Sequence, residues 1–327
     1  MPLDEVRRFI GEADSFIVST HVNPDGDGIG SAMAIKWALL ALGKRAEIII
    51  DATPPDTFHF FTNYSWLTPY QEGMERSVSA QAAIIVDCPS AERTGRVARV
   101  VSGARTLIID HHISNERYGD VNYLDDAAAS SAEMVYRIIK HLGLTIDSAC
   151  AEYIYSGVIV DTGRFRFSNT KPETLRTAAE LVAAGAHPAK VSEGIFYSNT
   201  LETTHALGAF IGSIRLHHGG VVATAEFGYE YLRRPEYKLV NHEGFVNHAL
   251  AIRGVEVAMF LREVERSVTR ASLRSKTIVD VNALAQAFGG GGHARAAGCT
   301  IETPLDQAKA ALLARVEEML PPPAVGR

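Results

Sequence analysis

Imidazole and carboxylate side chains follow three short apolar runs of the sequence. The runs are residues 16–20, 83–86 and 106–109, and the side chains that follow them are His21, Asp87 and Asp110. β-branched runs of this length that end abruptly in a polar residue are typical of buried parallel strands. Because ligands bind beyond the carboxyl ends of such strands, the three side chains are expected to share one crevice.

Further donors adjoin these positions. A glycine-rich turn after the first run carries Asp25 and Asp27, and Asp110 is followed by His111 and His112. Several carboxylates in one crevice repel one another and resist ionisation unless cations compensate their charge. A donor set of imidazoles and carboxylates without thiolates favours Mn²⁺, Mg²⁺ or Co²⁺ over structural zinc. The residues therefore predict a metal cluster.

Three other interpretations of the turn at residues 25–30 fit less well. A calcium loop of the EF-hand type needs a ligand where Ile29 stands. In a dinucleotide-binding fingerprint the third glycine would come one residue later than Gly30, and acidic side chains would face the pyrophosphate. A plain surface turn explains the Asp-Gly pairs, but it does not explain why two other apolar runs end in acidic residues.

Helical patterns must position these side chains. They cover residues 29–42, 132–142 and 172–184, and each is followed by a glycine. Their alternation with apolar runs predicts an α/β domain, a parallel sheet with helices on both faces, at residues 1–185. Ser130 and Glu133 have the spacing of a capping box, so Ser130 is interpreted as a helix cap and not as a ligand.

A second, smaller domain of mixed α/β type is predicted at residues 207–320, after a linker at 186–206. The length of 327 residues suits two domains, since single cores seldom grow beyond about 250–300 residues. Strand-like stretches occur at residues 213–216, 221–226, 255–263 and 268–275. The proline-rich tail at 321–327 is expected to be disordered. The His217-His218-Gly219-Gly220 run lacks acids and is interpreted as a solvated turn.

Composition excludes several classes of protein. The net charge of −6 argues against binding long duplex nucleic acid, whose affinity comes mainly from Lys and Arg contacts to phosphates. The three cysteines form no CxxC pair, so neither a disulfide framework nor a zinc knuckle is implied. Every apolar run is shorter than the roughly 20 residues of a membrane span, and the N-terminus does not resemble a secretory signal. A cytosolic location without membrane association is therefore expected.

The motifs together resemble the DHH family of phosphoesterases. The matching stretches are HVNPDGDGIGS from His21, IIVD ending at Asp87, IIDHH ending at His112, and VIVDTGRF around Asp161. Towards the C-terminus, SLRSK at 272–276 and AFGGGGHARAAG at 287–298 resemble the DHH-associated domain of that family. Periodicity alone predicts a strand at residues 154–160, whereas the resemblance implies a helix that ends at Asp161.

The resemblance implies a centre of two divalent cations, with Mn²⁺ preferred and Mg²⁺ or Co²⁺ as alternatives. The first cation would be held by His21, Asp25 and Asp87, and the second by Asp27, Asp87, His111 and Asp161. Asp87 would bridge the two. Asp110 would orient a ligand imidazole, and His112 would face the scissile phosphate or the leaving oxygen.

Substrate contacts are expected in the second domain, across a cleft from the metals. Gly290, Gly291 and Gly292, ahead of His293, would let the backbone approach a phosphate closely. The resemblance favours this interpretation over a flexible turn. On the strand-like stretch 268–275, alternation places three possible phosphate donors on one face: Arg270, Ser272 and Arg274. Arg274 is the preferred contact, and Arg270 is equally well explained as a solvated side chain.

The length of the chain and its motifs most resemble the nanoRNase branch of the family. That branch cleaves short oligoribonucleotides and removes phosphate from 3′-phosphoadenosine 5′-phosphate by attack of a hydroxide activated by two metals. The expected partners are therefore short single-stranded RNA or small nucleotides, and a homodimer is left open. The alternatives are a phosphodiesterase for cyclic or linear dinucleotides (c-di-AMP or pApA) and a non-catalytic nucleotide sensor. A RecJ-like exonuclease and a family II pyrophosphatase fit less well.

Overall fold

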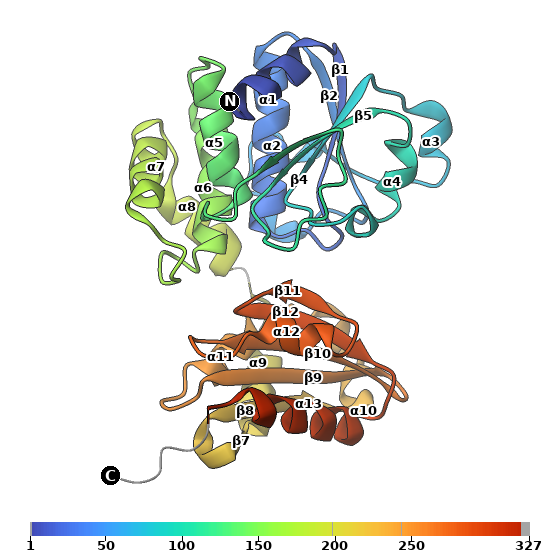
Figure 1. Cartoon of the computed structure of the whole chain (residues 1–327), viewed down its shortest axis with the longest axis vertical. Helices are drawn as coiled ribbons and strands as arrows, with labels where there is room; N and C mark the ends of the chain where they lie inside the picture. Colours follow the sequence, from blue (N-terminus) through green and yellow to red (C-terminus); the bar gives the residue numbers. More distant parts are fainter. Residues whose placement is uncertain (1, 198, 243, 322–327) are drawn as a thin grey trace. The chain divides into compact units, whose positions relative to one another are not determined.

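A computed structural model describes residues 2–197, 199–242 and 244–321 of the chain. It divides into two compact units, Met1–Ser198 and Asn199–Arg327 (Figure 1). The disordered tail predicted at 321–327 lies, apart from Pro321, outside the described residues. Among the described helices, none combines the length and the apolar character that crossing a membrane requires.

A six-stranded parallel sheet forms the centre of the first unit. Its strands follow the order β3-β2-β1-β4-β5-β6. Their bounds are β1 Ser15–Ser19, β2 Arg45–Ile50, β3 Leu67–Pro69, β4 Ala82–Val86, β5 Arg105–Asp110 and β6 Val121–Leu124. The inner strand β4 is buried along its whole length, which is why its sequence is continuously apolar and does not alternate.

Helices cover both faces of this sheet, as the sequence predicts (Figure 1). Phe16 and Val18 of β1 pack into the main core, and Ile17 points to the opposite face, where Val97 packs on it. The helices of the main-core side are α1 Pro2–Gly11, α2 Gly26–Ala41, α5 Ser131–His141, α6 Ser148–Asp161, α7 Pro172–Ala183 and α8 Pro188–Phe196. The opposite face carries two short helices, α3 Met74–Ser77 and α4 Val97–Val100, and the connections include the 3₁₀ turns η1 Asp56–Phe58, η2 Tyr64–Trp66 and η3 Glu92–Thr94.

The strand that periodicity predicts at residues 154–160 is wrong, because this stretch is the end of helix α6. The helix is buried on nearly every side from Cys150 to Ile159, since it packs against α2, α5 and α7. A helix that is apolar all round shows no amphipathic period, so its sequence cannot be distinguished from that of a buried strand. The resemblance to the DHH family gives the correct helix end at Asp161.

Regular helices occupy much of residues 186–206, which the sequence analysis assigns to a linker. Helix α8 begins at Pro188, a favoured residue for the first helical turn. Helix α9, Leu201–Ser213, begins after Thr200, whose side chain accepts a hydrogen bond from the Thr203 N–H. Because α9 extends to Ser213, the first strand of the second unit begins at Arg215 and not at residue 213.

The second unit is of mixed α/β type, with a sheet in the order β11-β12-β10-β9-β8-β7. Strands β8 and β9 run parallel, and the other neighbours are antiparallel. The strands are β7 Arg215–His217, β8 Val222–Phe227, β9 Val257–Glu265, β10 Val268–Ser275, β11 Gly291–His293 and β12 Ala296–Ile301. Its other helices are α10 Tyr229–Leu232, α11 Phe245–Leu250, α12 Val281–Gln286 and α13 Leu305–Met319, with η4 His218–Gly220 and η5 Pro235–Leu239.

Each face of the second sheet has its own apolar core. Met259 and Leu261 pack with α12 and α13, whereas Phe260 packs on the other face with α9 and α11. The His217–Gly220 run forms the β7–β8 hairpin connection, where His217 Nε2 lies 2.9 Å from Thr224 Oγ1. The structure thus agrees with the interpretation of this run as a turn.

Close packing explains a glycine of the first motif. A Cβ atom at Gly30 of α2 would collide with the backbone carbonyl oxygen of Tyr153 in α6. A backbone atom cannot turn away as a flexible side chain can. Gly30 therefore lets α2 and α6 lie side by side at short range, and these two helices make the most extensive helix–helix contact in the unit.

Gly30→Ala should lower the free energy of unfolding by about 1–3 kcal/mol, the usual range for overpacking a filled core. Gly11→Ala at the end of α1 is the matched control, because no atom lies within 4 Å of the added methyl group, and it should be neutral or stabilising by up to about 1 kcal/mol. Urea unfolding of both variants measures the difference. Equal midpoints would show that α2 and α6 can separate without cost.

Candidate metal centre

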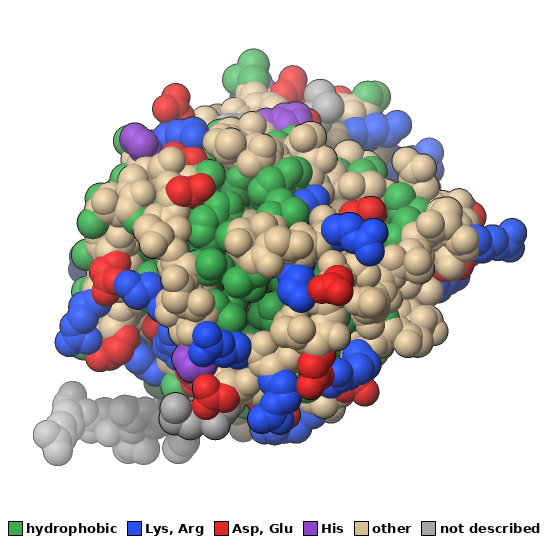
Figure 2. All heavy atoms as spheres, turned by 90° about the horizontal axis from the view of Figure 1, so that it is seen from above, with side chains coloured by type: hydrophobic (Ala, Val, Ile, Leu, Met, Phe, Trp, Pro, Cys, Tyr) green, Lys and Arg blue, Asp and Glu red, His purple; other side chains and the backbone are tan. Residues whose placement is uncertain are grey.

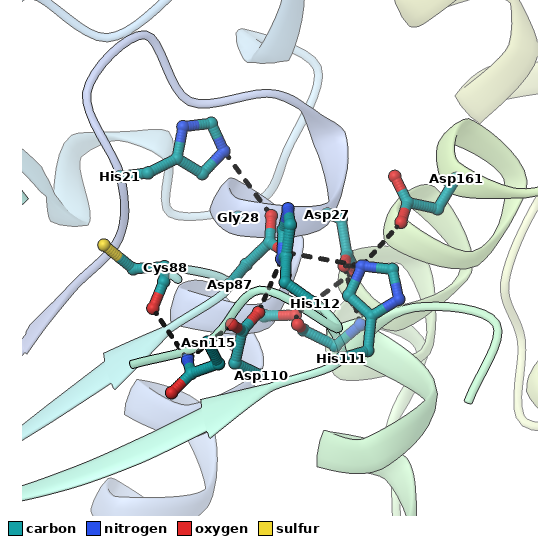
Figure 3. Close-up of polar contacts among 12 residues, drawn as sticks. His21, Asp27, Gly28, Asp87, Cys88, Asp110, His111, His112, Asn115 and Asp161 are labelled. Atoms are coloured by element: carbon teal, nitrogen blue, oxygen red, sulfur yellow. Dashed lines mark hydrogen bonds and ion pairs between the residues drawn. The ribbon is translucent and has the colours of Figure 1, made fainter. Parts of the chain in front are cut away.

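The predicted ligands meet where the strand order of the first sheet reverses. The chain leaves β1 towards β2 on one side, and β4 lies against β1 on the other, which is the position where open α/β sheets bind ligands. His21 follows β1, Asp87 follows β4, and Asp110 ends β5. Figure 3 shows these side chains together with Asp27 at the start of α2 and His111.

One donor group consists of His21, Asp25 and Asp87, whose ligand atoms all lie within 4.8 Å of one another. His21 Nε2 lies 3.5 Å from Asp87 Oδ2. Asp25 is the N-cap of α2, where its Oδ1 accepts hydrogen bonds from the backbone N–H groups of Asp27 and Gly28. This cap uses Oδ1, so Oδ2 can serve as the ligand atom.

A second donor group consists of Asp27, Asp87 and His111. His111 Nε2 lies 3.8 Å from Asp27 Oδ2, 3.6 Å from Asp87 Oδ1 and 3.0 Å from Asp161 Oδ2. Asp161, at the end of α6, contacts His111 beside this group (Figure 3), but it belongs to none of the groups of described residues whose ligand atoms all lie within 4.8 Å of one another. Asp87 belongs to both groups, which is the arrangement that a bridging carboxylate requires.

The backbone of Asp87 is unusual. Its φ angle is +53°, in the left-handed region that residues with a side chain seldom adopt. The N–H group of Asp87 still donates to the Ile109 carbonyl of β5 at 2.9 Å, so the chain turns sharply just after its last sheet hydrogen bond. Strained conformations of this kind are retained where a side chain must be held in a particular direction.

The N-terminus of α5 holds two of the candidate ligands. Asp27 accepts from the backbone N–H of Ser131 at 2.7 Å and from that of Ala132 at 2.8 Å. The Ser131 hydroxyl donates to Asp87 Oδ1 at 3.2 Å. The neighbouring Ser130 hydroxyl accepts from the Glu133 N–H at 3.1 Å, so the predicted helix cap is confirmed.

Burial and mutual repulsion disturb the acidity of these groups. Burial, followed by the charge of Asp161, raises the pKa of Asp27 to about 8. Burial and the neighbouring Asp27 likewise raise the pKa of Asp87 well above its usual value. For His111, burial opposes the charged form, but the adjacent Asp161, Asp27 and Asp87 raise its pKa well above the usual value.

Asp110 has a different environment from the other acids. It is fully buried, and burial alone would raise its pKa, but hydrogen bonds from His112 and Asn115 lower it below the usual value. His112 Nδ1 lies 2.7 Å from Asp110 Oδ1, and Asn115 Nδ2 donates to Asp110 Oδ2 at 2.6 Å. Asp110 therefore orients His112, whereas the sequence analysis expects it to orient a ligand imidazole.

The donor set fits a pair of divalent cations. Carboxylates with raised pKa values need a positive charge nearby to ionise together, and the two donor groups share one carboxylate. Oxygen and imidazole donors without thiolates suit Mn²⁺ or Mg²⁺. The assignment of each ligand to a particular cation stays a prediction.

The residues predicted to bind substrate lie in the second unit. Arg270, Ser272 and Arg274 alternate along β10 with the core residues Ala271 and Leu273, so they share one face of the sheet. Arg270 is exposed, and the other two are half-buried. Their contact with a substrate stays a prediction.

Sheet packing accounts for two glycines of the GGGGH stretch. Gly291–His293 is strand β11, which pairs with β12. A Cβ atom at Gly290 or Gly292 would collide with backbone carbonyl oxygens of Gly298 or Ala296. Gly290 and Gly292 are therefore required by the fold whether or not this stretch also binds phosphate, a distinction that the sequence alone cannot make.

Sequence reasoning missed three residues that contact the site. Ser131 lies between the two residues of the predicted capping box and has no motif of its own, and Asn115 carries no recognisable signal. Arg93, in η3, places Nη2 3.2 Å from His21 Nδ1. Ser131 and Arg93 contact groups that are 44 and 72 residues away in sequence, so only the fold brings them to the site. Asn115 lies five residues from Asp110, but no motif marks this contact.

Comparison with known proteins identifies the family. The model of the DHH family, N-terminal domain, matches residues 15–158, and that of the DHHA1 domain matches residues 231–320. The bifunctional oligoribonuclease and PAP phosphatase NrnA of Thermus thermophilus is 34% identical over 93% of this chain and 89% of the relative. The protein of the same name from Bacillus subtilis is 30% identical over 91% and 92%. The chain belongs to the DHH family.

Solved structures agree on the fold. An exopolyphosphatase-related protein from Bacteroides fragilis superposes with a TM-score of 0.88 at 24% identity, covering 97% of this chain and 96% of that protein. The exonuclease RecJ of Thermus thermophilus gives a TM-score of 0.54 at 12% identity, and the match covers 54% of RecJ. The two-unit architecture is thus shared with the B. fragilis protein over nearly its whole length.

Ser131→Ala should weaken metal binding about 10-fold or more, because it removes the hydroxyl that fixes Asp87 while leaving both backbone donors to Asp27 in place. Mn²⁺ affinity can be measured by isothermal titration calorimetry. Ser130→Ala is the matched control, because it removes the helix cap, and it should cost about 1 kcal/mol of stability without changing Mn²⁺ affinity. Identical affinities in the two variants would rule out a role for Ser131 at the metals.

Proposed function

We propose that this protein is a metal-dependent phosphoesterase that hydrolyses short oligoribonucleotides to nucleoside monophosphates, and 3′-phosphoadenosine 5′-phosphate to AMP and phosphate. The observation that carries the proposal is the buried Asp87, shared by two donor groups at the switch point of the sheet. Relatives named oligoribonuclease and PAP phosphatase match nearly the whole chain, which supports the same substrates here.

In this proposal His21, Asp25 and Asp87 hold one cation, and Asp27, Asp87, His111 and Asp161 hold the other. Two divalent cations supply a water of lowered pKa and neutralise the charge of the phosphoryl oxygens. Mn²⁺ is the proposed metal, since mixed imidazole and carboxylate donors suit it. Ser131 and the N-terminus of α5 keep Asp27 and Asp87 in place between turnovers.

His112 has a role separate from metal binding. Asp110 fixes its ring through Nδ1, which directs the chemistry of the imidazole to Nε2. In its protonated form, His112 can donate a proton from Nε2 to the leaving oxygen as the phosphoester bond breaks. Asn115 holds the second oxygen of Asp110, so this ring has few alternative orientations.

The surface charge of the protein, as well as its similarity to the named relatives, supports short single-stranded substrates. On the face shown in Figure 2, Lys and Arg side chains are interspersed with Asp and Glu around a hydrophobic area. A mixed surface and a net charge of −6 do not suit the many phosphate contacts of a long duplex. A cytosolic location also stays a prediction from the sequence, and a homodimer stays open.

Asp87→Ala should abolish hydrolysis of both pApA and 3′-phosphoadenosine 5′-phosphate and should reduce bound metal, because both donor groups lose a shared ligand. His112→Ala should lose kcat but retain its metal, because its expected partner is the leaving oxygen. Metal content by mass spectrometry, together with kcat at saturating Mn²⁺, separates the two variants.

Two results would contradict these assignments. Wild-type turnover by Asp87→Ala would remove Asp87 from the centre. Loss of metal on removal of the His112 imidazole would make it a ligand, which its position near Asp87 and Asp110 makes geometrically feasible.

Arg274→Ala should lower kcat/KM on a five-nucleotide RNA about 10–100-fold, if Arg274 binds a substrate phosphate remote from the scissile bond, since a charge-assisted hydrogen bond is worth about 1.5–3 kcal/mol. A small chromogenic phosphodiester has no remote phosphate and should lose far less. The control is metal content, which should be unchanged. Equal losses on both substrates would exclude a remote contact for this arginine.

A further inference from the structure

A pair of arginines faces one another in the second unit with no acidic partner. Arg262 of β9 lies directly opposite Arg270 of β10 in the antiparallel register. Within residues 2–197, 199–242 and 244–321, no carboxylate forms an ion pair with either side chain. Like charges placed directly opposite on neighbouring strands destabilise a sheet, so the pair needs an explanation.

Arg262 also has a buried polar atom that makes no hydrogen bond. Its Nε atom is buried and has no hydrogen-bond partner among the described residues. The guanidinium carbon lies 5.3 Å from the centre of the Phe260 ring. Burial and the charge of Arg270 lower the pKa of Arg262, which reflects a cation held in apolar surroundings without a counter-charge.

Two neighbouring side chains present further buried polar atoms. The Arg262 Nη1 group contacts His242 Nε2, and since a guanidinium only donates, Nε2 accepts and the ring proton lies on Nδ1. His242 Nδ1 and the Tyr237 hydroxyl are buried without a hydrogen bond of acceptable geometry, and their rings lie nearly parallel, 6.3 Å apart.

His242 is neutral and therefore does not compensate the positive charge of the two arginines. Burial and the charge of Arg262 lower its pKa to about 4, although the backbone of Val240 opposes the shift. At neutral pH the cluster therefore consists of two guanidinium groups, a neutral imidazole and a phenol. The Arg262 Nε–H and the Tyr237 O–H have no partner among the described residues, and both can donate a hydrogen bond, so the missing partner is an acceptor. The positive charge of the two guanidinium groups favours an anion.

We propose that Arg262, Arg270, His242 and Tyr237 form a binding site for a phosphate-class anion, either free phosphate or the phosphate group of a nucleotide. The planar fork of a guanidinium matches two oxygens of a phosphate. Because the Arg262 Nε is buried and its Nη1 contacts His242, we expect the side chain to leave His242 when the anion binds, while the exposed Arg270 provides the outer contact. The site uses none of the candidate metal ligands, and of the residues expected to contact substrate it uses only Arg270, so Arg262, His242 and Tyr237 test it apart from the proposed hydrolysis.

Binding can be measured by isothermal titration calorimetry of the whole protein with inorganic phosphate, AMP and adenosine. EDTA and constant ionic strength suppress contributions from the metal centre and from screening. The Arg274→Ala background removes the other proposed phosphate contact. The test variants are Arg262→Leu and Arg270→Gln. Arg266→Leu is the matched control, because Arg266 follows the same strand but pairs with Glu230 at 3.2 Å.

Phosphate and AMP should bind saturably, and Arg262→Leu should weaken both about 10–100-fold, whereas Arg266→Leu should leave both unchanged. The unfolding midpoint of Arg262→Leu should equal or exceed that of the parent, because a buried charge without a counter-charge has been removed. Tighter binding of AMP than of phosphate identifies a nucleotide ligand, and equal affinities identify phosphate itself. Both results support the site.

Other outcomes overturn it. Absence of saturable phosphate binding, or adenosine binding as tight as that of AMP, would exclude a phosphate site. An Arg262→Leu variant that binds normally but unfolds earlier would show a purely structural arginine. If that variant fails to fold, phosphate binding by Arg270→Gln and Tyr237→Phe tests the site instead. Arg270→Gln alters an exposed residue, and Tyr237→Phe removes only a hydroxyl without a partner, so both variants should fold.

Discussion

Repulsion among buried carboxylates is the constraint on which the first unit depends. Asp27 and Asp87 are at most 3% exposed, and each raises the cost of ionising its neighbours. The fold offsets this repulsion partly by directing the N-terminus of α5 at Asp27 and partly by placing His111 among the acids. The remainder is a deficit of positive charge that divalent cations are suited to fill.

The parallel character of the first sheet and the strand ends that carry most candidate ligands could be predicted because they follow from short-range rules, whereas the order of the strands was not predicted. An apolar run that ends in His21 or Asp87 indicates a strand and its carboxyl end, and parallel strands bring such ends together. By contrast, α6 could not be assigned from its pattern, since a helix buried on all sides has no amphipathic period. Asp161 was found only through the likeness of its motif to a family.

Hydrogen bonds between particular side chains were beyond sequence reasoning, whether the partners are 44 residues apart, as Ser131 and Asp87 are, or five apart, as Asn115 and Asp110 are. The local sequence around Ser131 or Asn115 does not indicate that their side chains donate hydrogen bonds to Asp87 and Asp110. Glycines were ambiguous for a related reason, because a residue without a side chain serves close backbone packing and ligand approach equally well. At Gly30 and Gly290 the structure shows the packing requirement directly.

The close approach of α2 and α6 has a consequence for the choice of ion. Asp27 lies at the start of α2 and Asp161 at the end of α6, so the spacing of these helices sets the span between two candidate donors. Gly30 lets the helices approach to a distance that a Cβ atom would prevent. If Asp27 and Asp161 hold the same ion, as proposed, that distance sets the size of ion they fit, because Mg²⁺ takes oxygen ligands at about 2.0–2.1 Å and Ca²⁺ at about 2.3–2.6 Å. Forcing the two helices apart should therefore shift the preference of the site towards the larger ion.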